Sequence, residues 1–181
     1  MGGFSEGFDW HIMIFVGGAS GTGKTTAIER FVNRHPGFLH LRASSILRNC
    51  GRPIQNLSLL ELKENQRLLR KGLLRMHLSP TTILDGHMTV PAENTLFQVP
   101  ASFFEGLALS AFVLLWTEPS QLLQRRGQPI SPQALAAIEE LQHSERQQMH
   151  RVAAHYGCPV EILSSKEDYL LERILLQHGT R

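Results

Sequence analysis

The stretch "GGASGTGKTTAIERF", residues 17–31, decides the fold of this chain. Its residues 18–25 match the pattern G-x-x-x-x-G-K-[ST] in full. Glycines in such a loop allow backbone angles that turn successive N–H groups inward, and the following helix adds the positive end of its dipole. The apolar run "HIMIFVG" (His11–Gly17) precedes the loop and predicts a strand buried on both faces. This order of strand, loop and helix predicts a phosphate-binding loop, not a glycine-rich turn that merely starts a helix.

The phosphate-binding loop predicts a nucleotide ligand and assigns roles within it. The Lys24 ammonium is expected to reach the β- and γ-phosphates, and the Thr25 hydroxyl to ligate Mg²⁺. ATP as phosphoryl donor and Mg²⁺ are therefore the predicted cofactors. We expect the ATP-binding residues to be Gly18, Ala19, Ser20, Gly21, Thr22, Gly23, Lys24, Thr25 and Thr26.

Strands and helices alternate along the rest of the chain. Such alternation implies βαβ units and a parallel sheet under helices, so we predict a three-layer α/β/α fold with a five-stranded parallel sheet. The length of 181 residues suits one domain over residues 1–181. Besides 11–17, the expected strands are 38–41, 81–85, 111–116 and 159–163, and the expected long helix is Pro132–Tyr156.

Composition excludes several classes of partner. The formal charge of +2 is too small to favour nucleic acid as the main partner. Cys50 and Cys158 form no metal or redox spacing, which favours reduced thiols in the cytosol. Residues 1–10 lack the apolar core of a signal peptide, and the longest apolar stretch, Leu107–Trp116, is half the length that spans a bilayer. We expect a cytoplasmic protein without a membrane partner, and the sequence specifies no oligomeric state.

A second candidate for the metal site is the acid after the strand "TTILD". P-loop proteins need a carboxylate at the end of a neighbouring strand to organise Mg²⁺, and Asp85 has this place, followed by a glycine that permits a tight turn. The alternative is that Asp85 only caps a turn. His87, two residues later, either contacts substrate or Asp85 or is a solvated loop histidine.

Together these stretches resemble the nucleoside monophosphate kinases, adenylate kinase most of all. The segment "HLRASSILR" (His40–Arg48) is similar to the family motif after the second strand, although Ser44-Ser45 replaces its central T-G-D. The turn "ILDGHMTVP" and the segment "HSERQQMHRVAAHYGCPVEIL" (143–163) resemble the archaeal type, while the family's arginine after D-G is missing.

The resemblance implies an acceptor site and a lid. It implies an acceptor-binding helical region at residues 42–78 and a short lid at residues 125–132. In this family the lid arginines stabilise charge on the transferred phosphoryl group, whereas two arginines at a helix end can also simply favour its dipole. Arg146 or Arg151 could replace further lid arginines of the archaeal type. The implied acceptor-binding residues are Arg42, Ser44, Arg48 and His87, and the catalytic residues are Lys24, Asp85, Arg125 and Arg126.

The sequence thus predicts a kinase that moves the γ-phosphoryl of Mg-ATP to a small-molecule acceptor, foremost a nucleoside monophosphate. A nucleoside or another small alcohol is the alternative acceptor, and it would benefit from Asp85 or His87 as a general base. A nucleotide-dependent switch or assembly ATPase with slow hydrolysis is the rival class. The segment Pro91–Gly106, with its adjacent Phe103 and Phe104, either shapes the acceptor pocket or covers the sheet.

Overall fold

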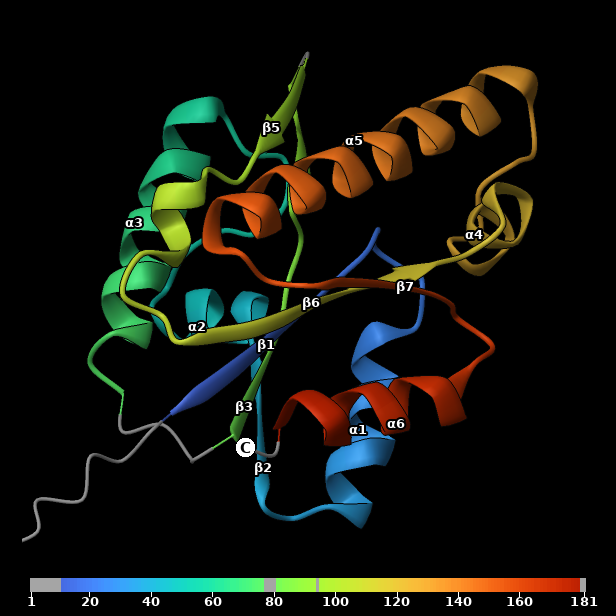
Figure 1. Cartoon of the computed structure of the whole chain (residues 1–181). Coiled ribbons are helices and arrows are strands. Elements are labelled where there is room, and N and C mark those ends of the chain that lie inside the picture. The colour runs from blue at the N-terminus through green and yellow to red at the C-terminus, as the bar shows by residue number, and fades with distance from the viewer. Residues whose placement is uncertain (1–10, 77–80, 94, 180–181) are drawn as a thin grey trace, which may run out of the picture.

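A computed structural model of the chain describes residues 11–76, 81–93 and 95–179. Figure 1 shows the arrangement of its strands and helices. The strands are β1 (Ile12–Gly17), β2 (Phe38–Arg42), β3 (Thr81–Asp85), β4 (Thr89–Ala92), β5 (Thr95–Gln98), β6 (Leu109–Trp116) and β7 (Val160–Ser164). The helices are α1 (Lys24–Arg34), α2 (Ala43–Asn49), α3 (Leu59–Leu73), α4 (Pro119–Arg125), α5 (Pro132–Tyr156) and α6 (Asp168–Gly179), with a 3-10 turn, η1, at Ala101–Phe104.

Five strands form one parallel sheet in the order β2-β3-β1-β6-β7. This confirms the predicted five-stranded parallel sheet and all five predicted strand positions. In the register of the sheet, Asp85 of β3 lies opposite Val16 of β1 and Arg42 of β2. Because parallel strands end at one edge of the sheet, the loops after β1, β2 and β3 meet there, which is where such folds bind ligands.

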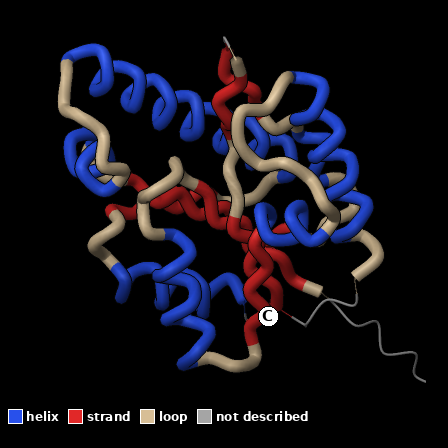
Figure 2. The backbone as a smooth tube through the Cα atoms, turned by 180° about the vertical axis from the view of Figure 1, so that it is seen from behind, coloured by secondary structure: helices blue, strands red, loops and turns tan. Residues whose placement is uncertain are grey.

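Helices cover both faces of the sheet, so the three-layer α/β/α fold is confirmed (Figures 1 and 2). One face packs against α1 and α6, through side chains such as Ile28 and Leu175. The other face packs against α2, α3, η1 and α5, through side chains such as Leu73 and Met149. The side chains of β1 and β3 are almost wholly buried between the helical layers, as expected for a parallel sheet covered on both sides.

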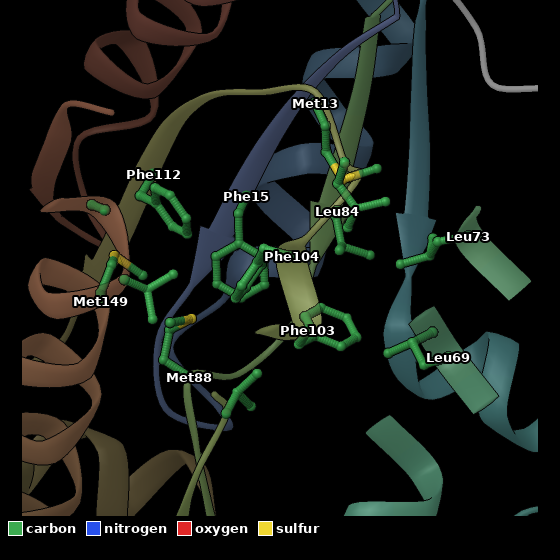
Figure 3. Packing of buried hydrophobic residues seen from close by; sticks show 14 of the residues in the cluster. Met13, Phe15, Leu69, Leu73, Leu84, Met88, Phe103, Phe104, Phe112 and Met149 are labelled. Carbon is green, nitrogen blue, oxygen red and sulfur yellow. The ribbon is translucent and has the colours of Figure 1, made fainter. Parts of the chain in front are cut away.

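An aromatic cluster joins the sheet to the segment before β6. Phe104 of η1 packs edge-on against Phe15 and Phe112, with ring centroids 5.2 and 5.4 Å apart, and Phe103 packs edge-on against Phe104 (Figure 3). Leu69 and Leu73 of α3 belong to the same buried cluster. Phe104 therefore covers the sheet, as one of the two alternatives for this segment predicted, while Phe103 lines a cleft described below.

An antiparallel hairpin of β4 and β5 forms a separate two-stranded sheet. The sequence interpretation missed it, because each strand has four residues and Pro91 within β4 weakens the strand pattern. The hairpin follows the Asp85 turn directly and contacts α5. It therefore lies beside the edge of the main sheet at which the loops after β1, β2 and β3 meet.

The long helix α5 has the predicted bounds, with recognisable signals at both ends. Ser131 accepts a hydrogen bond from the Ala134 N–H and Pro132 occupies the first turn, while Gly157 ends the helix at a left-handed φ of 64°. Across the described parts of the chain, no helix is both long and apolar enough to cross a membrane.

Candidate active site

The loop after β1 has backbone angles that require its glycines. Gly18, Gly21 and Gly23 have φ of 139°, 85° and 94°, which L side chains rarely adopt. A Cβ on Gly18 would also collide with the backbone carbonyl oxygen of Leu115. Helix α1 begins directly after Gly23, so the free N–H groups of its first turn face the space that the loop encloses.

Lys24 is buried at the centre of the loop. Its Nζ donates to the carbonyl oxygens of Gly18 at 2.5 Å and Ala19 at 3.2 Å. Burial lowers the pKa of Lys24, although the charges of Asp85 and Glu145 act in the opposite direction. The ammonium therefore lies against the loop, at the place where the phosphates of a bound nucleotide would compete with the two carbonyls for it.

Asp85 and Thr25 meet at the edge of the sheet. The Thr25 hydroxyl donates to Asp85 Oδ2 at 2.5 Å, and His40 Nε2 lies 3.6 Å from the same oxygen. Burial favours the neutral form of Asp85, but His40, Lys24 and Thr25 together outweigh it and hold the pKa of Asp85 below its usual value. The structure thus brings the two predicted metal residues together and keeps the carboxylate ionised.

His87 faces the loop rather than solvent. Its Nδ1 lies 2.8 Å from the Gly18 carbonyl oxygen, so this nitrogen carries the proton in the neutral ring. Burial, with a smaller contribution from the charge of Lys24, lowers the pKa of His87 to about 3. His87 is therefore neutral near pH 7, and the solvated alternative for this histidine does not hold.

The two arginines at the end of α4 contact the phosphate loop from the other side. Arg126 donates through Nε and Nη2 to the Ser20 carbonyl oxygen, at 3.0 and 2.7 Å. Arg125 donates to the carbonyl oxygens of Thr22, at 3.2 Å, and Gly21, at 3.4 Å. Arg126 is half-buried and lines the cleft, whereas Arg125 is exposed beside it.

A cleft of about 1060 Å³ joins the phosphate loop to the region between α2, α3 and the hairpin. The four predicted acceptor-binding residues, Arg42, Ser44, Arg48 and His87, all line it. Arg42 is half-exposed, 3.8 Å from Glu29, and Arg48 is exposed. The end of the cleft away from the loop is rich in apolar side chains, namely Leu47, Ile54, Leu57, Leu62, Leu69, Val99 and Phe103.

The oxygen ligands at the loop suit Mg²⁺. Among residues 11–76, 81–93 and 95–179, no group of three or more His, Cys, Asp or Glu side chains could hold a metal ion. Mg²⁺ does not need such a cage, because it keeps several waters and takes one or two protein oxygens together with substrate phosphates. The hydroxyl of Thr25 and the carboxylate of Asp85 are in contact at the N-terminus of α1, and they fit that requirement.

Sequence reasoning missed Glu145, a fully buried carboxylate on α5. Its Oε1 accepts from the N–H groups of Gly18, at 2.9 Å, and Met88, at 2.8 Å, and its Oε2 accepts from the Thr89 N–H at 2.7 Å. Burial raises the pKa of Glu145 despite these three donors. The signal that could have revealed it is a charged residue on the face of the helix that carries Leu141 and Met149.

Arg146 and Arg151 do not reach the cleft. Both lie with His143 and His150 along a shallow groove of about 400 Å³ on the outer side of α5. Arg151 donates to Gln98 Oε1 at 3.1 Å and to Gln148 Oε1 at 2.9 Å. Neither arginine therefore replaces the further lid arginines of the archaeal type, and that alternative is not supported.

The chain matches one known protein family. A family described as the AAA domain matches residues 17–142, which is more than half of the chain. The chain belongs to this AAA-domain family. The match begins at the last residue of β1 and extends into α5, so it includes the phosphate loop, Asp85 and both α4 arginines. Among curated proteins, no sequence matches the chain.

Solved structures share the fold of this AAA-domain chain at low identity. A shikimate kinase from Acinetobacter baumannii in complex with shikimate is 18% identical, with a TM-score of 0.62 and coverage of 94% of this chain and 93% of that chain. A gluconokinase from Sinorhizobium meliloti 1021 is 15% identical, with a TM-score of 0.55 and coverage of 94% and 92%. A sugar kinase from Janibacter sp. HTCC2649 is 16% identical, with a TM-score of 0.56 and coverage of 93% and 94%. The predicted P-loop kinase fold is confirmed, while the finer likeness to adenylate kinase stays a prediction.

Proposed function

We propose that this protein is an ATP-dependent phosphotransferase that moves the γ-phosphoryl group of Mg-ATP to a small-molecule acceptor, foremost a nucleoside monophosphate. One observation carries the proposal. A single cleft has the phosphate loop and Asp85 at one end and an apolar, arginine-bearing pocket at the other. A donor and an acceptor bound in these two places would face each other beside the Thr25–Asp85 pair.

The donor end supplies charge and hydrogen bonds rather than covalent chemistry. The loop N–H groups and the Lys24 ammonium would bind the β- and γ-phosphates, and Thr25 and Asp85 would hold Mg²⁺. When bound, Mg²⁺ neutralises charge that develops on the phosphate oxygens. Asp85 fits this role because its low pKa keeps it ionised near pH 7.

The α4 arginines act on the transferred group in this proposal, as part of a short lid over residues 125–132. Phosphoryl transfer has a loose transition state with charge spread over three oxygens, so fixed positive charge accelerates it. Arg126 is already at the wall of the cleft, with two donors on the Ser20 carbonyl oxygen. A bound triphosphate would offer these donors a stronger acceptor, since charged partners roughly double the strength of a hydrogen bond.

The acceptor end supports a nucleotide acceptor. Its apolar side chains, which include Leu57 and Phe103, suit a flat base, and Arg42 and Arg48 would bind its phosphate. In that case the acceptor oxygen is already ionised and no general base is needed. The acceptor region that the sequence placed at residues 42–78 supplies most of this lining within its described part, residues 42–76.

A hydroxyl acceptor is the second candidate, and one observation favours it. Asp85 lines the cleft at its phosphate-loop end. It is ionised and is hydrogen-bonded only on one oxygen among its described contacts, so it could accept a hydroxyl proton. The similar folds of a shikimate kinase and a gluconokinase agree with this candidate. A slow nucleotide-dependent switch remains the rival from another class.

The deciding experiment mixes the protein with Mg-ATP and a panel of nucleoside monophosphates, nucleosides, sugars and hydroxy acids. We expect ADP release to depend on a nucleoside monophosphate, with the diphosphate product seen by phosphorus NMR. Release that depends on an alcohol supports the second candidate. Release that no acceptor changes, but that a protein or RNA raises, would overturn the phosphotransferase.

The variant Asp85→Asn then separates the two acceptor classes. With a phosphate acceptor, the loss comes from weak metal binding, so raising Mg²⁺ restores part of the rate and the residual rate varies little with pH. With a hydroxyl acceptor, the loss includes the missing base, and added Mg²⁺ does not restore the rate.

A further inference from the structure

Helix α5 carries four buried polar side chains on one face: Gln142, Ser144, Glu145 and Gln148. Buried polar groups of this kind are costly unless they are hydrogen-bonded, and each of these has described partners. Gln142 bonds both the N–H and the carbonyl oxygen of Thr117, and Gln148 donates to the Val99 carbonyl oxygen. The face therefore ties α5 to the ends of neighbouring strands and to the hairpin.

Glu145 differs from the other three because it bonds two segments that serve the two ends of the cleft. Gly18 is the first residue of the phosphate loop, whereas Met88 and Thr89 follow the Asp85 turn and begin the hairpin. Its Oε1 is shared between the Gly18 and Met88 N–H groups. A single atom thus links the donor loop to the segment after the Asp85 turn, in addition to the hydrogen bond between His87 and the Gly18 carbonyl oxygen.

We propose that Glu145 is a positioning residue that fixes the phosphate loop against the Asp85–Thr89 turn. Through Glu145, nucleotide binding at the loop changes the environment of the Met88 and Thr89 amides at the start of the hairpin. For its kinetic consequence, the inference rests on the phosphotransfer proposed above. Ser144 reinforces the hairpin side, because its Oγ lies 3.2 Å from Thr89 Oγ1 and accepts from Gln98 Nε2 at 3.1 Å.

The variant Glu145→Gln tests this role without changing the shape of the side chain. A glutamine has one oxygen and one NH₂ group, whereas all three partners are N–H donors. Its oxygen can face the shared Gly18–Met88 pair or the Thr89 N–H, but not both. The variant must therefore lose part of the link while it still fills the same space.

The first measurement follows backbone amide signals of ¹⁵N-labelled protein as Mg²⁺ and the non-hydrolysable analogue AMP-PNP are added. Shifts at the Gly18 and Lys24 amides report binding at the loop. In the wild type we expect further shifts at the Met88 and Thr89 amides. In Glu145→Gln we expect those two shifts to be mostly lost at saturation of the loop.

The matched control is Gln142→Leu, which removes a buried polar side chain on the same face but leaves Gly18, Met88 and Thr89 untouched. It should keep the wild-type shifts at Met88 and Thr89. Equal shifts of the Met88 and Thr89 amide signals in the wild type and in Glu145→Gln would overturn the inference. So would a wild type in which the Gly18 and Lys24 signals shift while the Met88 and Thr89 signals do not. A purely structural role predicts the same response from both variants.

The second measurement uses the acceptor found by the panel. Misplacing two bound groups slows their reaction more than it weakens either binding step, so Glu145→Gln should lower kcat by about 10- to 100-fold and change KM for ATP by less than about threefold. An unchanged kcat would overturn the inference. If no acceptor is phosphorylated by the wild type, the proposed function fails, and the amide shifts alone decide the role of Glu145.

Discussion

At the scale of the residue, the donor end of the cleft depends on a few charged groups that contact the phosphate loop directly. Lys24 is held by two loop carbonyls, Asp85 by Thr25 and His40, and the Gly18 carbonyl by His87. The hydrogen bonds among these contacts satisfy polar groups that would otherwise be buried alone. These hydrogen bonds hold the loop in one conformation, which reduces the conformational cost of nucleotide binding.

Replacing Lys24 by methionine removes the cation and keeps most of the volume. Because preorganised donors of this kind contribute strongly to the transition state, we expect Lys24→Met to lower kcat by about 10²- to 10³-fold. Steady-state assays with the identified acceptor measure this, and circular dichroism shows whether the fold is kept. A folded variant with a near wild-type rate would remove Lys24 from the proposed mechanism.

His87 should make stability depend on pH in a defined window. Its ring titrates near its ordinary pKa of 6.5 in the unfolded chain but only near about 3 in the native state. Between these values the unfolded state binds more protons, so the free energy of unfolding falls as the pH is lowered from 6.5 towards 3.

The variant His87→Gln isolates that effect from the titration of Asp85 and Glu145, which remain present in both proteins. We expect urea unfolding at several pH values to show a smaller loss of stability in His87→Gln than in the wild type across this window. Parallel curves for the two proteins would mean that His87 is as easily protonated in the native state as in the unfolded chain.

At the scale of the element, local sequence signals predicted most of the fold, while contacts between distant elements hid part of the site. The phosphate loop, Thr25 and Asp85 each stand at the end of an apolar strand or the start of a helix, so a short stretch of sequence was enough to find them. The bounds of α5 were predictable because Pro132 and Gly157 mark its ends.

The role of Glu145 could not be predicted in the same way. It is separated from Gly18 by 127 residues and from Met88 by 57, and only the packing of α5 brings them together. The hairpin of β4 and β5 was not predicted from the sequence for a related reason. It is held by α5 as well as by its own short ladder, so its four-residue strands carry little pattern of their own.

The end of α5 gives a prediction for the element as a whole. Gly157 has a left-handed φ of 64°, and a Cβ there would meet nothing within 4 Å, so only backbone strain opposes a side chain. We expect Gly157→Ala to reduce the free energy of unfolding by about 1–2 kcal/mol without changing kcat.

Gly37 provides the matched control for this substitution, since a Cβ at that position also meets nothing within 4 Å and its φ is not left-handed. Gly37→Ala should leave the stability close to that of the wild type or raise it slightly. Urea unfolding compares the three proteins. A Gly157→Ala protein as stable as Gly37→Ala would show that the end of α5 relaxes freely.

At the scale of the whole molecule, the cleft brings together parts that come from both halves of the chain. The phosphate loop and Asp85 lie in the first half, and Arg126 after α4 and Leu141 of α5 in the second. Arg125 and Arg126 both bond loop carbonyls, but only Arg126 lines the cleft. The two arginines should therefore differ in their effect on transfer.

We expect Arg126→Ala to lower kcat by about 10³-fold or more, as the loss of a transition-state arginine does in other phosphoryl transfers. Arg125→Ala should have a clearly smaller effect, because its side chain is exposed beside the cleft. Steady-state assays of both variants, with thermal unfolding as a check on the fold, measure the difference. Equal losses would indicate that the two arginines act as one unit.

The separation of the hairpin from the main sheet has a consequence for how this molecule can change. β4 and β5 pair only with each other within the described chain. They contact α5 through hydrogen bonds, and Leu96 and Phe97 of β5 pack against buried hydrophobic clusters. An inserted or exchanged ribbon at this place would leave the five central strands as they are. The wall of the cleft beside the proposed acceptor can thus be remodelled while the order of the five central strands is kept.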